Sequence, residues 1–250
     1  MTKCFLGKGR YESKIITLSA ARNIYMLYQE LKKDDFETDV VEVLRDTVEL
    51  AKDVLAGISR QDIDEIYMFF DYDIQQNNIR HGEKTVTADS ALREMLSVFN
   101  NETEHGKLYV NYPMVEALYD YKRSSCEAFY SCYVPIDRIK EYKTSSGENN
   151  PNASKHMQIE DWKDILNAFY LRIKCLFEFD ELSFDEYQNK VTPYEIYLKE
   201  TILIVEKKKV FVLSAFPEFL FDYFRLDFWK TMTPIKKYKF EKCERMGNRA

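Results

Sequence analysis

Hydrophobic residues recur along the first 120 residues with two alternating periods, which predict strands and helices in turn. Apolar or partly alternating runs at residues 15–18, 36–44, 66–70 and 107–111 favour strands. Between them, apolar residues spaced three and four apart predict helices whose inner faces are Ile24, Leu27, Tyr28 and Leu31, then Val48, Ala51, Val54, Leu55 and Ile58, then Leu92, Met95, Leu96 and Phe99. Pro113 is well placed to open a fourth helix.

This alternation of strands and helices favours right-handed crossovers and a mostly parallel sheet. The five consecutive apolar residues Ile66–Phe70 agree with it, because a strand covered on both faces reads as a continuous apolar run. We therefore expect an α/β fold, in which helices flank a mostly parallel, Rossmann-like sheet.

The second half of the chain is expected to be mainly helical. A polar loop over residues 144–155 precedes a strongly amphipathic helix over residues 159–177. Another helix is expected to start at Thr192-Pro193, a late strand covers residues 210–213, and Pro217 opens an aromatic helix. We expect one domain over residues 1–250, with residues 121–207 as a helical insertion before the last strand.

Composition excludes several classes of protein. The 250 residues are 45% hydrophobic and 31% charged, with a net charge of −6, which is typical of a globular chain. No run approaches the 18 apolar residues of a membrane span, and the first ten residues lack the apolar core of a signal peptide. The five Cys form no CxxC pair, which indicates reduced thiols and a cytoplasmic protein without a membrane partner.

The C-terminal end, residues 230–250, is basic, with seven Lys or Arg and two Glu. Such a tail suits nucleic acid or an acidic partner surface, and a solvated terminus is the equally weighted alternative.

The most informative chemistry is Asp71-x-Asp73, directly after the apolar run Ile66–Phe70. Ligands of open α/β sheets gather at the carboxyl ends of the strands, and two carboxylates there suit Mg²⁺, which keeps several water ligands. The alternative is that Asp71 caps a turn while Asp73 faces solvent. A DxD at a strand end also occurs in sugar-nucleotide transferases, so a glycosyltransferase is a further alternative.

Glu116 is the third candidate ligand. The strand at residues 107–111 leads through Tyr112-Pro113 to this residue, in the first turn of the expected helix. If that strand neighbours the DxD strand, Glu116 reaches the same sheet edge, where clustered acids need a cation to offset their repulsion. A Glu in a first turn also complements the helix dipole, which is the structural alternative.

These features together resemble the Toprim domain. The resemblance rests on the hhhhDxD run Ile66–Asp73 and on the turn Asn111–Glu116, and it covers roughly residues 15–120 and 208–225. The closer likeness is to Toprim proteins of bacterial phage-defence and abortive-infection systems, the overcoming-lysogenization-defect and RloB-like nucleases. The late segment VFVLSAFPEFLFDYF, residues 210–224, is similar to their closing strand and helix.

The resemblance implies a metal-dependent nuclease acting on DNA or RNA, with Asp71, Asp73 and Glu116 as catalytic ligands of Mg²⁺ or Mn²⁺. It also implies an ABC- or SMC-type ATPase partner, and a homo-oligomer is a further alternative. The chain departs from the family after its expected first strand. The family has a Glu there, whereas this chain has Ser19-Ala20-Ala21. A catalytically inactive Toprim-like binding module is therefore the second hypothesis.

Other chemistry is weaker. The residues that flank the expected site are Arg80, Lys84, Lys122, Arg123 and His81, and surface charges are usually only solvated. The three His have no ligand spacing, and no Walker A, GxGxxG or GxSxG motif is present. The aromatic residues within 216–229 are more numerous than one buried helix face needs. Two interpretations are open for them, packing in the core and a surface that binds a partner protein.

Overall fold

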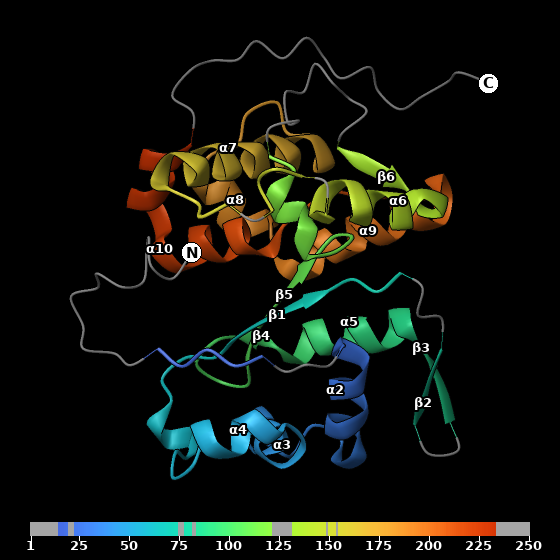
Figure 1. The fold of residues 1–250 in the computed structure, drawn as a ribbon, viewed down its shortest axis with the longest axis vertical. Coiled ribbons are helices and arrows are strands. Elements are labelled where there is room, and N and C mark those ends of the chain that lie inside the picture. Colours follow the sequence, from blue (N-terminus) through green and yellow to red (C-terminus); the bar gives the residue numbers. More distant parts are fainter. Residues whose placement is uncertain are drawn as a thin grey trace. The chain divides into compact units, whose positions relative to one another are not determined.

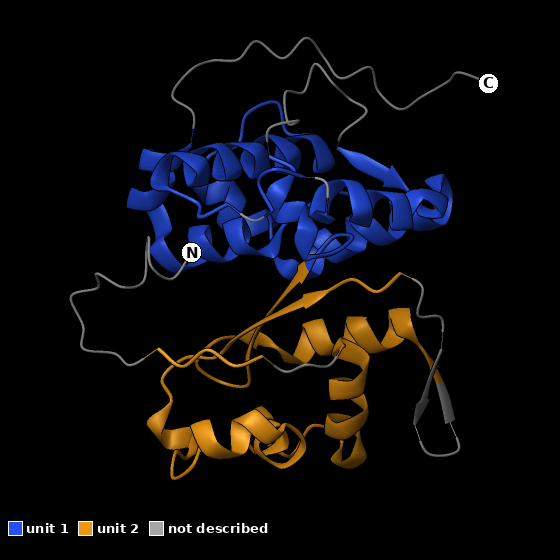
Figure 2. Ribbon diagram, viewed as in Figure 1, with its two compact units in different colours: residues 1, 111–250 blue, residues 2–110 orange. Residues whose placement is uncertain are grey.

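The structure is a computed structural model that describes residues 15–19, 23–74, 78–81, 84–121, 132–148, 150–153 and 155–233. The side chains of residues 78–81, 84 and 85 lie outside this description. The chain divides into two compact units, residues 2–110 and residues 111–250, which we call the N-terminal and C-terminal units (Figure 2). The single-domain organisation with an insertion over residues 121–207 stays a prediction.

Three short helices begin the described part of the N-terminal unit: α2 (Ile24–Leu31), α3 (Val40–Thr47) and α4 (Glu49–Val54), accompanied by the 3-10 turns η2 (Lys32–Asp34) and η3 (Arg60–Asp62) (Figure 1). The predicted first helix is confirmed. Asn23 caps α2 because its side-chain oxygen accepts the amide hydrogen of Met26 at 3.0 Å. The predicted inner face of α2 is buried: Ile24, Leu27, Tyr28 and Leu31, together with Tyr25.

The expected second strand over residues 36–44 is wrong, because residues 40–47 form the helix α3. Asp39 starts this helix, with its Oδ1 accepting the amide hydrogen of Val41 at 2.7 Å. Val40, Val41 and Val43 are buried in helical geometry. A cap and burial in the tertiary structure have therefore outweighed the strand preference of these valines.

The expected first strand is wrong as well. Residues 15–19 are described without regular secondary structure, and Ile15 is 48% exposed. The run at residues 15–18 has only three apolar residues, Ile15, Ile16 and Leu18, and does not fix a strand without a partner strand and a buried face.

The sheet of the N-terminal unit contains β1 (Tyr67–Asp71), β5 (Gly106–Asn111) and β4 (Asn100–Asn101), in the order β1-β5-β4. The predicted strands at residues 66–70 and 107–111 are thus confirmed. β4 pairs with β5 in antiparallel fashion, and β2 (Asn78–His81) forms an antiparallel hairpin with β3 (Lys84–Thr87). The chain is therefore α/β and mostly helical, with small sheets, and the mostly parallel sheet is not confirmed.

Helix α5 (Ala88–Val98) supplies much of the core of this unit, as its spacing predicts. Thr87 caps it, because its Oγ1 accepts the amide hydrogen of Ser90 at 3.1 Å. The buried apolar residues of this helix and of the strands include Ala91, Leu92, Met95, Leu96, Met68, Leu108, Tyr109 and Val110.

The C-terminal unit is built mainly from helices (Figure 1). Its elements are η4 (Val115–Tyr119), β6 (Tyr133–Pro135), η6 (Ile136–Arg138), α6 (Ile139–Lys143), the π-helical turn η7 (Thr144–Glu148), α7 (Ile159–Leu176), α8 (Phe184–Lys190), α9 (Pro193–Lys207), β7 (Lys209–Phe211) and α10 (Ala215–Met232). The helices predicted at residues 159–177 and from Thr192-Pro193 are confirmed. Thr192 caps α9, with Pro193 in its first turn.

The late strand exists as β7, but its pairing differs from the expectation. It pairs in antiparallel fashion with β6, with Phe211 opposite Tyr133, and does not extend the β1-β5-β4 sheet. Beyond β7, Leu213 forms an isolated antiparallel bridge with Tyr112. Helix α10 follows and is interrupted at Arg225, whose φ is 61° and ψ is −152°.

Aromatic side chains fill the core of the C-terminal unit. The ring centroid of Trp229 lies 4.9 Å from that of Tyr187 and 4.8 Å from that of Phe221. Tyr223 and Leu226 are each 40% exposed. The excess of aromatic residues in α10 therefore serves core packing first, and leaves a smaller exposed apolar surface near the kink.

Candidate functional site

Asp71 and Asp73 lie where the sequence predicts, at the carboxyl end of β1. Asp71 is the last residue of the strand and is exposed, whereas Asp73 follows two residues later and is half-buried. Both residues take part in interactions within the structure. The position at a strand end agrees with the expected place for ligand-binding groups in an α/β protein.

An aromatic layer lies on the strands next to these acids. The ring of Phe69 stacks on that of Tyr109, with centroids 5.6 Å apart and an interplanar angle of 17°. Tyr67 lies 6.5 Å from the same Tyr109 ring, and the Lys107 ammonium is 5.4 Å from its centroid. Because side chains alternate along a strand, Tyr67, Phe69 and Asp71 share one face of β1.

The turn that carries Glu116 starts at the end of β5. Asn111 is buried, and its Oδ1 accepts the amide hydrogen of Ala215 at 2.9 Å, at the start of α10. Tyr112 and Leu213 exchange two backbone hydrogen bonds of 2.8 Å each. The Tyr112–Pro113 peptide is cis, and the expected α-helix after Pro113 is instead the 3-10 helix η4. The turn is therefore fixed to the segment that leads into α10.

The side chain of Glu116 is half-buried against η7. A Cβ atom placed on Gly147 would lie 3.0 Å from Glu116 Cγ and 3.4 Å from its Oε1. Within the described part of the chain, Glu116 forms no hydrogen bond or ion pair, although its charge contributes to the raised pKa of Tyr142. A half-buried carboxylate in this setting is able to accept a cation or a hydrogen-bond donor.

A buried polar cluster, comprising Asp120, Tyr142, Ser146 and Arg172, lies beside Glu116. Arg172 donates from Nη2 to the carbonyl oxygen of Asp120 at 2.8 Å, and the same atom lies 3.9 Å from Asp120 Oδ2. Arg172 and Asp120 are each only 3% exposed. Such a pair is held in place by its mutual attraction, since either charge alone would be strongly disfavoured in the interior.

Tyr142 completes the cluster. Burial raises the pKa of its hydroxyl, the charges of Asp120 and Glu116 raise it further, and the charge of Arg172 opposes them. Tyr142 is therefore a neutral phenol at physiological pH. Among the described residues, its hydroxyl, Ser146 Oγ and Arg172 Nε have no hydrogen-bond partner.

Sequence reasoning missed this cluster, although one signal was available. Arg172 lies three residues after Phe169 and seven after Ile165, on the apolar face of α7. A charged residue in an inward position usually has a buried partner. Asp120 and Tyr142 do not stand out in the sequence in this way, because only the tertiary structure brings them next to Arg172.

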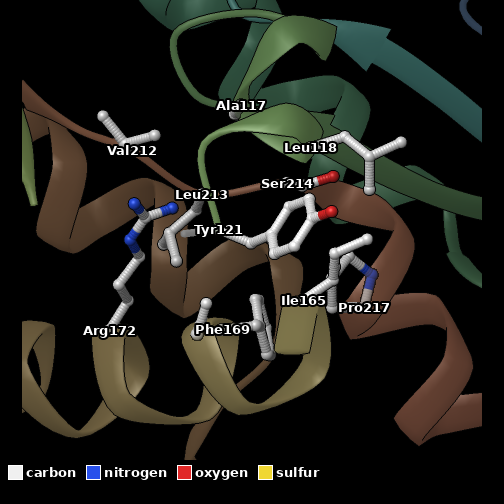
Figure 3. Close-up of a pocket in the computed structure, with 11 residues that line it drawn as sticks. Ala117, Leu118, Tyr121, Ile165, Phe169, Arg172, Val212, Leu213, Ser214 and Pro217 are labelled. Atoms are coloured by element: carbon white, nitrogen blue, oxygen red, sulfur yellow. The ribbon is translucent and has the colours of Figure 1, made fainter. Parts of the chain in front are cut away.

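A small pocket adjoins the cluster (Figure 3). Its walls come from η4, α7 and the segment that leads into α10, and they are mostly apolar, with Arg172 and Ser214 as polar members. Tyr121 also lines the pocket, and its hydroxyl donates to Asp161 Oδ1 at 3.0 Å.

The three predicted metal ligands belong to different units. Asp71 and Asp73 lie in the N-terminal unit and Glu116 in the C-terminal unit, so their assembly into one cluster stays a prediction. Within the described ranges, no group of three or more His, Cys, Asp or Glu is arranged to hold a metal ion.

The structure gives little support to the weaker candidate residues, which are the His residues, the Lys and Arg residues near the expected site, and the basic tail. His105 and His156 are exposed. Arg80, His81 and Lys84 lie on the β2–β3 hairpin, but their side chains are outside the described ones. Lys122, Arg123 and residues 234–250 of the basic tail lie outside the described residues.

Comparison with protein-family models, with curated proteins and with solved structures found no match for this chain. Among the helices of the described ranges, none has the length and apolar character needed to cross a membrane.

Proposed function

We propose that this protein is a Toprim-like, divalent-metal-dependent nuclease effector, in which Asp71, Asp73 and Glu116 hold Mg²⁺ or Mn²⁺. The observation that carries the proposal is the exposure of Asp71 at the carboxyl end of β1, with Asp73 two residues further on. Two carboxylates suffice for Mg²⁺, which keeps much of its water shell and binds phosphate oxygens readily.

The candidate ligands have separate tasks in this proposal. Asp71 and Asp73 are to hold a cation by their carboxylate oxygens, and Glu116 is to supply a further oxygen ligand from the 3-10 helix η4. A bound cation would polarise the phosphodiester and stabilise the charge on the leaving oxygen. Tyr142 stays protonated and neutral because it is buried.

The test is cleavage of plasmid DNA and of tRNA with Mg²⁺ or Mn²⁺, comparing the wild type with Asp71→Ala. We expect cleavage by the wild type and its loss in the variant. Asp64→Ala is the matched control, because Asp64 is an exposed carboxylate of the same unit, a few residues before β1. Equal activity in wild type and Asp71→Ala would contradict the proposal.

A catalytically inactive Toprim-like binding module is the second candidate, and two observations favour it. Residues 15–21 contain no acid where the family has its Glu. Residues 40–47 are also helical, where a Toprim-like order of elements calls for a strand. For this candidate we expect no cleavage of either nucleic acid, but retention of DNA or RNA in a gel-shift assay.

The proposal includes a cytoplasmic role in antiviral defence and a separate ATPase partner. Support for a partner comes from α10, where Tyr223 and Leu226 are each 40% exposed beside the interruption at Arg225. Exposed aromatic and apolar side chains in a group are enriched in protein interfaces. Co-purification of an ATPase with the wild type, and its loss with Tyr223→Ser/Leu226→Ser, would support this part.

A further inference from the structure

Three consecutive lysines lie at the connection between α9 and β7. Lys207 is the last residue of α9, Lys208 is its C-cap, and Lys209 is the first residue of β7. Lys207 and Lys208 are exposed, and Lys209 is half-buried. The backbone of the connection is held in place, since the Lys208 carbonyl oxygen accepts the amide hydrogen of Ile136 at 3.0 Å. The Lys209 ammonium lies 4.0 Å from the centroid of the Tyr133 ring, a cation–π contact that orders this side chain.

Lys208 has a backbone conformation that favours glycine. Its φ is 53° and its ψ is 39°, in the left-handed region. Glycine is the usual residue directly after a helix in this conformation, because a side chain there raises the conformational energy. A lysine is therefore unfavourable for the fold itself at this position. Such an outlier is a physical reason to look for a function of the side chain.

A second basic segment lies beside the three lysines. β6 pairs with β7 and leads through η6 into α6. Arg138 ends η6, and Lys140 and Lys143 belong to α6, and all three are exposed. Figure 1 shows β6, α6 and the end of α9 in the same region of the C-terminal unit. We call the six basic residues of the two segments the basic patch: Arg138, Lys140, Lys143, Lys207, Lys208 and Lys209.

The acids of the same segments do not neutralise the basic patch. Residues 136–143 and 206–209 contain six basic and three acidic residues, so they carry a net charge of +3 in a chain whose net charge is −6. Within the described ranges, none of the six patch residues forms an ion pair with a carboxylate. Other described cations do form such pairs, namely Lys32, Lys33, Lys52, Arg60, Arg93, Lys155, Arg172 and Lys190. Unpaired cations in a group create a positive potential that attracts a polyanion.

We propose that the basic patch binds the phosphate backbone of a nucleic acid. All six residues belong to the C-terminal unit, so the surface is complete within that unit. Lysine and arginine contacts to phosphates fix a nucleic acid on a protein without reading its sequence. The choice of nucleic acid among polyanions rests on the proposed function, whereas the excess of unpaired positive charge does not.

The experiment measures binding of fluorescently labelled duplex DNA and duplex RNA to the full chain by anisotropy, at a series of salt concentrations. EDTA is present throughout, so that binding is measured apart from any metal-dependent cleavage. Lys207→Gln/Lys208→Gln removes two charges from the basic patch. We expect the plot of log K against log salt concentration to become shallower by about 2, about one for each lysine removed. Affinity should fall for every sequence alike, because phosphates are the same in all of them.

Two further double variants accompany this one. Lys140→Gln/Lys143→Gln removes two charges from the other segment of the patch and should change the slope by a similar amount. Lys163→Gln/Lys230→Gln is the matched control and should leave the slope unchanged, because these two exposed lysines belong to α7 and α10.

A single variant keeps the test decisive if a double variant does not fold. Lys208→Gly removes one charge and suits the left-handed backbone, so it should not lower the melting temperature. We expect it to make the slope shallower by about 1. A slope equal to that of the wild type in Lys208→Gly and in both double variants of the patch would overturn the proposal.

Failure of the wild type to bind either nucleic acid would also overturn the proposal. Binding of phosphatidylserine vesicles in its place would assign the patch to an anionic membrane surface. The nuclease proposal fails separately. Patch-dependent binding in EDTA, without cleavage of plasmid DNA or tRNA in Mg²⁺ or Mn²⁺, would contradict the nuclease and support the patch. Cleavage that is lost in Asp71→Ala, with binding unchanged in the patch variants, would overturn the patch alone.

Discussion

Arg172 binds Asp120 twice over, through a 2.8 Å hydrogen bond to its carbonyl oxygen and through a charge contact of 3.9 Å to its carboxylate. The pair joins the 18-residue helix α7 of the C-terminal unit to the turn that carries Glu116. The position of that turn therefore depends on a contact more than 50 residues away in the sequence.

Removing the charge of Arg172 should strongly destabilise the C-terminal unit. We expect Arg172→Met to lower the free energy of unfolding by about 3–5 kcal/mol, because Asp120 would remain buried without its counter-charge. Denaturant titration measures the change. Lys190→Met is the control, because its contact with Glu186 at 3.4 Å is exposed and should contribute less than about 1 kcal/mol. Equal effects of the two substitutions would contradict this view of Arg172.

Asn111 should contribute to stability through the start of α10. Its Oδ1 accepts the amide hydrogen of Ala215 at 2.9 Å, in a buried position. We expect Asn111→Ala to cost about 1–3 kcal/mol in denaturant titration, because the buried amide then loses its acceptor. Ser214→Ala should cost less, since the Ser214 hydroxyl contacts Asn111 only at 3.5 Å. A larger effect of Ser214→Ala would contradict the assignment.

Glu200 should make stability fall as pH rises. Its side chain is fully buried, and burial raises its pKa well above 4.5, which the hydrogen bond from the Phe211 amide only partly opposes. Above pH 4.5 the unfolded chain releases this proton while the folded protein keeps it, so folding is favoured less as pH increases. The loss is at most about 1.4 kcal/mol per pH unit until the pKa of the folded state is reached.

Glu200→Gln should remove this dependence, because an amide does not ionise. We expect the variant to gain stability over the wild type between pH 5 and pH 8, measured as the difference in the denaturant midpoint. Glu206→Gln, an exposed position of the same helix, is the control and should follow the wild type. Parallel pH profiles for wild type and Glu200→Gln would show that Glu200 is ionised in the folded state.

The cation proposal predicts a metal response that depends on the DxD carboxylates. We expect millimolar Mg²⁺ or Mn²⁺ to raise the melting temperature of the wild type, because a ligand that binds the folded state stabilises it. Asp71→Asn and Asp73→Asn should each lose most of the shift, and Asp64→Asn should keep it. A full response in Asp71→Asn would place the cation elsewhere.

Local patterns predicted individual elements well where capping and periodicity agreed. The 3.6-residue spacing of α2, α5 and α7, and the Thr192-Pro193 start of α9, were all readable from the sequence. The apolar run before Asp71 also gave β1 correctly. In these segments local preference and tertiary packing favour the same structure.

The pattern failed where local preference and context disagree. Val40, Val41 and Val43 favour a strand, but Asp39 caps them into a helix that buries them. The pairing of β7 with β6 depends on contacts between residues some 75 positions apart, and no local period encodes it. For the same reason the buried cluster of Asp120, Tyr142 and Arg172 could not be predicted from local sequence patterns. Those patterns indicated only Asp71, Asp73 and Glu116 as candidate site residues.

The hydrogen bond from the Phe211 amide to Glu200, at 2.9 Å, also protects a vulnerable edge. A short two-stranded ribbon such as β6–β7 ordinarily leaves peptide groups open to a strand from another molecule, which is how edge-to-edge aggregation begins. Here the carboxyl group of Glu200, from the neighbouring helix α9, accepts the hydrogen bond of one of those peptide groups, that of Phe211. Polymerisation through β7 would have to displace this side chain first.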